Sequence, residues 1–138
     1  MFQLELRAMK RIKFQDMTLD QLIERFVAIA LAQDEADQEE NNAKYNRLFD
    51  QMIELMAEFL SRPIEQRRAL MALYEHPNPQ VRYKAAFITK DLAPQAARRV
   101  YEIISERNEY PQAANARRAI RNLDEGDTDM SWILNRRR

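Results

Sequence analysis

Apolar residues recur along most of the chain at steps of three and four positions, the spacing that puts them on one side of an α-helix. The first long stripe follows Thr18, which together with Gln21 makes the sequence pattern of a capping box at a helix start. The periodicity predicts helices over residues 18–34, 43–61, 64–75, 79–92, 95–107 and 112–124. It predicts no sheet in the core.

Prolines mark the boundaries in the second half of the chain. Four of them stand where a helix begins: Pro63, Pro79, Pro94 and Pro111. Proline suits the first helical position because its missing N–H would have no partner there. The 138 residues contain five prolines and one glycine, whereas sheets with tight turns and phosphate-binding loops both consume glycine. The composition therefore favours helices joined by short turns.

A weak internal repeat supports a stacked arrangement. Pro79-Gln80 and Pro111-Gln112 are 32 residues apart, and Arg67-Arg68 and Arg98-Arg99 are 31 apart. A period of this size is typical of helical repeat arrays, in which neighbouring helix pairs complete one another's core. We therefore predict an all-α fold, a right-handed HEAT- or armadillo-like stack of about three antiparallel helix pairs.

Two resemblances agree with this fold. The stretch from Leu70 to Leu92 resembles a HEAT repeat, whose second helix typically carries Val-Arg followed by Ala, here Val81-Arg82 and Ala85. Longer motifs occur in order at 22–26, 33–35, 46–50, 66–70, 76–82, 109–113 and 123–126. With these motifs the chain, over about 17–126, resembles a bacterial family known as domain of unknown function two-thousand-nineteen. The resemblance implies a HEAT-like helical fold and no assigned activity.

The resemblance divides the chain into three parts. Residues 17–126 form the HEAT-like domain, residues 1–16 an amphipathic N-terminal extension, and residues 127–138 a C-terminal tail. Because Thr18 already completes a helix start, we expect deletion of residues 1–16 to leave the fold intact. We expect Trp132, with Ile133 and Leu134, to pack back on the domain or on a neighbouring chain. A weak homodimer through the extension or the Trp132 tail is one such arrangement.

Catalytic and metal-binding patterns are sparse. There is no cysteine, and His76, the one histidine, stands before two prolines and is interpreted mainly as a turn residue rather than a base or ligand. The acidic run Asp34–Glu40 lacks the alternating ligands and turning glycine of a calcium loop, which favours a solvated loop over a cation site. We therefore predict a protein that is not an enzyme, with no catalytic residue, no cofactor and no metal.

The candidate partner-binding residues are Arg82, Tyr83, Lys84 and Phe87. They fall on the second helix of a pair, the layer that lines the concave face of helical solenoids, and a tyrosine flanked by basic residues is a plausible interface anchor. Ordinary surface packing explains them about as well. The first hypothesis is a non-enzymatic module that binds an unidentified protein. A narrower form is an immunity- or antitoxin-like protein that neutralises a basic nuclease by charge complementarity.

Nucleic-acid binding is the alternative hypothesis. Clustered arginines support it: Arg67, Arg68, Arg82, Arg98, Arg99, Arg117 and Arg118. Charge argues against it, because residues 18–129 hold 15 basic and 20 acidic side chains. No apolar run is long enough for a transmembrane helix, and the chain begins without a signal-peptide pattern. We expect a cytoplasmic protein.

Overall fold

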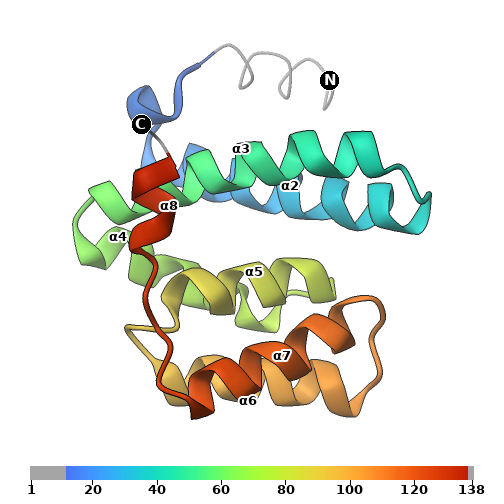
Figure 1. Cartoon of the computed structure of the whole chain (residues 1–138). Coiled ribbons are helices and arrows are strands. Elements are labelled where there is room, and N and C mark those ends of the chain that lie inside the picture. Colours follow the sequence, from blue (N-terminus) through green and yellow to red (C-terminus); the bar gives the residue numbers. More distant parts are fainter. Residues whose placement is uncertain (1–11, 137–138) are drawn as a thin grey trace.

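The computed structural model describes residues 12–136 and is helical throughout that range, with no strand. In chain order the elements are η1 (Phe14–Asp16), α2 (Leu19–Gln38), α3 (Asn42–Ser61), α4 (Ile64–Arg68), η2 (Ala69–Glu75), α5 (Pro79–Thr89), α6 (Pro94–Glu106), α7 (Gln112–Asp124) and α8 (Ser131–Arg136). Three helix pairs stack on one another: α2 with α3, η2 with α5, and α6 with α7 (Figure 1). None of these helices is long and apolar enough to cross a membrane.

The helices begin where the sequence places their caps. The Thr18 hydroxyl accepts the backbone N–H of Gln21 at 3.2 Å, and the Gln21 amide oxygen accepts the Thr18 N–H at 2.9 Å, which completes the predicted capping box. Asn41 caps α3, and Asn78 caps α5 by accepting the backbone N–H of Gln80 at 2.8 Å. The first pair of helices therefore follows the prediction closely.

The end of α2 differs from the prediction of a solvated loop over Asp34–Glu40. The helix continues to Gln38, and Asp34 is buried. The prediction was wrong for this half of the run because the Asp34 carboxylate is held by amide groups from distant helices instead of by water. Only the turn around Glu40, which has a positive φ of 56°, leaves the helical conformation.

Two further boundaries differ from the predicted ranges. The predicted helix over 64–75 is α-helical as far as Arg68 and a 3-10 helix beyond it. The i→i+3 bond from His76 N–H to the Leu73 carbonyl, 3.0 Å, closes this segment before Pro77. Helix α5 ends at Thr89, earlier than residue 92, and Ala93, which precedes Pro94, is non-helical with φ −148° and ψ 70°.

The core consists of two apolar clusters, and α5 contributes to both. Val81, Ala85 and Ile88 are fully buried in the larger cluster, which also includes residues of α2, α3, η2 and α8. Ala86 belongs to the smaller cluster formed with α6 and α7. Helix α5 is thus the central layer of the stack, which fixes the orientation of its remaining side chains.

Both ends of the described range pack on the first helix pair. Ile12 and Phe14 lie against the larger cluster, and the Arg62 guanidinium donates to the carbonyls of Phe14 at 3.1 Å and Met17 at 2.8 Å. Residues 12–16 of the predicted extension therefore contact the domain, whereas residues 1–11 lie outside the described residues. At the other end, α8 packs against α3.

The expectation that the tail packs back on the domain is met only in part. Ile133 is fully buried in the core, whereas Trp132 and Leu134 remain 42% and 41% exposed. A 3.0 Å bond from the Ile133 N–H to the Met130 carbonyl lies at the start of α8. Helix α8 therefore presents one apolar residue to the domain and leaves two large ones at the surface.

Candidate partner-binding face

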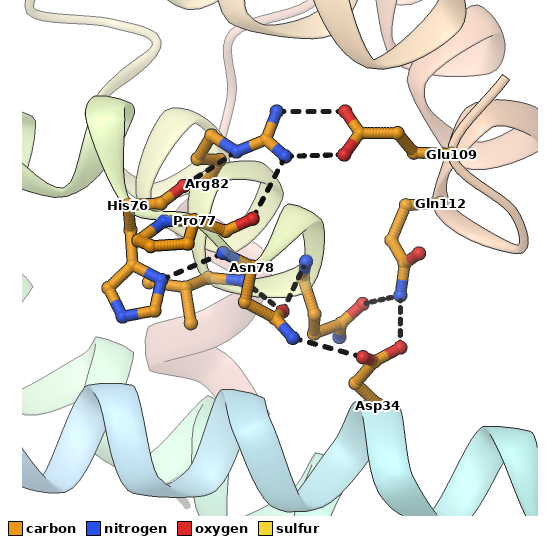
Figure 2. Close-up of polar contacts among 9 residues, drawn as sticks. Asp34, His76, Pro77, Asn78, Arg82, Glu109 and Gln112 are labelled. Atoms are coloured by element: carbon orange, nitrogen blue, oxygen red, sulfur yellow. Dashed lines mark hydrogen bonds and ion pairs between the residues drawn. The ribbon is translucent and has the colours of Figure 1, made fainter. Parts of the chain in front are cut away.

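A polar network joins the three helix pairs at one end of the stack. Asn78 Nδ2 and Gln112 Nε2 donate to the two carboxylate oxygens of Asp34 at 3.0 and 2.9 Å (Figure 2). Gln112 Nε2 also donates to Gln80 Oε1 at 3.0 Å, and Gln80 Nε2 donates to Gln33 Oε1 at 3.1 Å. The two repeated Pro-Gln pairs thus bring one glutamine from each of the last two helix pairs together. This network connects layers and is not exposed to a partner.

Arg82, one of the four predicted partner-binding residues, lies beside this network and also connects two helix pairs. Its guanidinium forms a two-pronged ion pair with Glu109, at 2.6 and 3.0 Å (Figure 2). Its Nε donates to the His76 carbonyl at 2.8 Å, and the side chain is only 7% exposed. A guanidinium already held on three sides has little left for a partner, so Arg82 is not part of the candidate face.

His76 has the geometry of a turn residue. Its Nδ1 accepts the Asn78 N–H at 3.0 Å, which requires that nitrogen to be unprotonated. Burial and then the nearby Arg82 charge lower the pKa of the imidazole. His76 also borders a small cavity of about 310 Å³ with Arg82. Within residues 12–136 no group of three His, Asp or Glu side chains converges as a metal site.

The other three predicted residues lie together with two aromatic side chains from neighbouring helices. We call this set the aromatic–cationic face: Phe49 of α3, Tyr83, Lys84 and Phe87 of α5, and Trp132 of α8. The Lys84 ammonium lies 5.5 Å from the Phe49 ring centre and 5.6 Å from that of Tyr83. The Phe87 and Trp132 rings meet edge to face at 6.4 Å. These helices approach one another on a single side of the stack (Figure 1).

Cations and rings alternate along this face. Arg136 lies over Phe49 at 5.4 Å, and Lys90 lies over Phe87 at 4.4 Å. Such cation–π contacts hold a cation near a surface without neutralising its charge. The face therefore combines aromatic rings with cations, and of these Arg136 is already paired with Asp50.

The two lysines differ in their electrostatic surroundings. Burial lowers the pKa of Lys90, but the carboxylates of Asp127, Asp91 and Asp129 oppose that shift. Burial alone lowers the pKa of Lys84, to about 8, and no carboxylate or hydrogen bond compensates it within the described residues. Lys84 is thus the cation of the face whose charge still lacks a counterion.

Most of the arginines that suggested nucleic-acid binding are already paired. Arg67 forms an ion pair with Asp91 at 2.6 Å, Arg98 pairs with Asp124, and Arg99 contacts Glu106 at 3.4 Å. Arg117 donates to Ser105, Tyr110 and Asn108, as Arg82 does to Glu109. Four of these arginines are therefore held in ion pairs on separate helices, and Arg117 is held by neutral acceptors.

Two members of the face were not among the residues predicted from the sequence. Phe49 reads as one more apolar position of the α3 stripe, and Trp132 as a tail residue that needs cover. Their place beside Lys84 and Phe87 depends on how α3 and α8 pack on α5, which no local pattern states. One indication was present in the sequence, because a side chain as large and apolar as Trp132 is expected to pack on the domain or on another chain.

Comparisons with known proteins place the chain without assigning an activity. A family model described as a domain of unknown function (DUF2019) matches residues 20–124. The crystal structure of the protein RPA1889 from Rhodopseudomonas palustris is similar, with a TM-score of 0.80 and 36% sequence identity over 86% of this chain and 98% of that chain. No curated protein matched.

Proposed function

The chain belongs to the DUF2019 family, and on its own geometry we propose that it is a non-enzymatic, HEAT-like helical-repeat module that binds a protein partner through the aromatic–cationic face. The stack of three helix pairs and the 32-residue spacing of its Pro-Gln pairs support the repeat assignment. In this arrangement α3 and α5, the second helices of the first two pairs, carry the binding surface together with α8.

The observation that carries the proposal is the unpaired charge of Lys84. Burial of the Lys84 ammonium, which lies between Phe49 and Tyr83, lowers its pKa and so costs folding free energy that no carboxylate of the described residues offsets. A partner that supplies a carboxylate would regain part of that free energy on binding. The neighbouring rings of Phe87 and Trp132 would cover an apolar side chain of the same partner. The proposed ligand is therefore an acidic segment that also carries aliphatic or aromatic residues.

Two other partners fit less well. Proteins that bind single-stranded nucleic acid also use rings and cations, but they need a continuous row of free cations. Arg67, Arg82 and Arg98 are instead held in ion pairs. A basic nuclease, as in the immunity-like hypothesis, would need an acidic surface. Exposed Glu35, Asp37, Glu39 and Glu40 supply one at the end of α2 and in the turn that follows, and none of them belongs to the aromatic–cationic face. We rank both below an acidic protein segment.

Peptide display on the immobilised full chain tests the proposal. Selection is run in parallel against the parent and against Lys84→Glu, which reverses the charge at the centre of the face. The expected result is enrichment, on the parent alone, of peptides that combine Asp or Glu with aliphatic or aromatic residues. Enrichment of basic peptides, or equal enrichment on both proteins, would refute the proposed site.

A spectroscopic control locates the binding. An enriched peptide should shift the amide resonances of α5 and α8 in the labelled full chain, and its affinity should fall as salt rises. Arg99→Glu serves as the matched control, since it reverses an exposed charge on α6 outside the face. A fluorescent single-stranded oligonucleotide tested in the same buffer should not bind with comparable affinity.

A further inference from the structure

A second cavity lies on the first helix pair, apart from the network and from Lys84. Its volume is about 770 Å³, within the range of small-molecule sites. The N-terminal segment around Phe14, helix α3 and helix α8 enclose it. Ile53, Ala57 and Ile133 supply buried apolar wall, and Arg25 of α2 lines the cavity with them.

Arg25 differs from the other buried arginines of the described chain. Arg67 and Arg82, which are buried to the same degree, each face a carboxylate at 2.6 Å. Arg25 is 7% exposed, and its hydrogen-bond partner is neutral: its Nη2 donates to Gln51 Oε1 at 3.3 Å. Its Nε is buried and has no acceptor among residues 12–136. A guanidinium remains charged in a protein, so Arg25 holds a positive charge beside a cavity with one buried N–H that has no acceptor.

The carboxylates that border the cavity do not serve as its counterion. Asp50 pairs with Arg136 at the surface. Glu54 is exposed and forms no ion pair with Arg25. Burial alone accounts for the lowered pKa of Arg25, with no carboxylate opposing it. The anion that the guanidinium requires is therefore missing from residues 12–136.

We propose that this cavity binds a small monocarboxylate with an apolar body, whose carboxylate is held by Arg25 and whose body lies against the partly exposed Ile12 and Phe14, in front of the buried apolar wall. A carboxylate matches the planar fork of a guanidinium and can accept two parallel bonds from it. Besides Arg25, the charged side chains that line the cavity are Lys13, Glu54 and the Asp50–Arg136 ion pair. The apolar wall selects against small polar acids.

Titration of the full chain with decanoate, followed by calorimetry and by amide shifts, tests the assignment. Decanoate should bind, whereas acetate, which lacks the apolar body, and decanol, which lacks the charge, should each bind at least about tenfold more weakly. The shifts should centre on α3 and α8 around the cavity. Equal binding of decanol, or no binding of decanoate, would overturn the proposal.

Arg25→Met separates recognition from a structural role. It keeps the length of the side chain and removes the charge, so decanoate affinity should fall by about tenfold to a hundredfold. The ligand-free variant should melt at or above the temperature of the parent, because an unpaired buried charge has been removed. Arg25→Lys should bind with intermediate affinity, and Arg99→Met, on α6, should bind like the parent. Unchanged binding by Arg25→Met, or a melting temperature more than about 5 °C lower, would show that Arg25 serves the fold instead.

Discussion

Replacing Lys84 by methionine should stabilise the protein at neutral pH. Burial lowers the pKa of the ammonium from 10.5 to about 8, which at about 1.36 kcal/mol per unit is a cost of roughly 3 kcal/mol to the folded state. The two cation–π contacts offset about 0.5–1 kcal/mol each. Methionine keeps the length of the side chain and removes the charge, so the net gain should be about 1–2 kcal/mol. With about 2.1 cal/mol/K of unfolding entropy per residue and 138 residues, that gain raises the melting temperature by roughly 3–7 °C.

The pH dependence identifies the cause of the gain. Below pH 8 the lysine is protonated in both the folded and the unfolded chain, so the cost is present in full. Between pH 8 and 10.5 the folded protein loses the proton first, and the free energy of unfolding rises with pH relative to the variant. Above pH 10.5 both states are neutral and the cost is gone. The difference between Lys84→Met and the parent should therefore be largest at pH 7 and shrink towards pH 10.5.

Denaturant unfolding at pH 7, 8, 9 and 10 measures this difference directly. Lys44→Met, which removes a lysine at the start of α3, is the control and should show a small difference that does not change in that pH range. A variant at Lys84 that is less stable than the parent, or a difference that is constant with pH, would mean that the ammonium is stabilised where it lies. In that case the Lys84 ammonium would need no further counterion.

Three further changes test the fold. Val81→Asp places an unpaired carboxylate at a fully buried position and should cost several kcal/mol, so the variant should be largely unfolded by circular dichroism; a melting temperature within 2 °C or so of the parent would contradict this. Gln112→Leu removes the bonds to Asp34 and Gln80 and should lower the free energy of unfolding by about 1–3 kcal/mol in a denaturant titration, with the fold retained. Deleting residues 1–16 removes packing at the larger cluster and should lower the melting temperature by several degrees, contrary to the expectation from sequence that this segment is dispensable; an unchanged melting temperature would restore that expectation.

The helices were predictable because their signals are local. Thr18, Asn78 and Pro79 act on the backbone within one turn, and the apolar stripes require only a period of 3.6 residues. The buried stripe of Val81, Ala85 and Ile88 follows from the same period. For these helices, the residue that caps or starts the helix lies within a few positions of the backbone that it shapes.

The site was less predictable because its contacts join distant positions. Asp34 reads as part of an acidic surface run until Asn78 and Gln112 are known to lie against it, 44 and 78 residues away. Arg82 reads as a free surface cation until Glu109 is found opposite it. Charge and polarity in a sequence do not indicate burial, since a buried polar group needs partners that only the packing of layers provides.

The polar network also explains how the aromatic–cationic face is presented. Apolar packing between helices tolerates small rotations and shifts, whereas the bonds from Asn78, Gln80 and Arg82 have fixed partners on α2 and on the segment before α7. These three side chains lie at the start of α5, so they fix both its position along the stack and its rotation about its own axis. Lys84 follows two residues later and is held towards Phe49 of α3 as a consequence, while Tyr83 packs against Tyr101 of α6. The residues that proved unavailable to a partner thus determine the direction in which the available ones point.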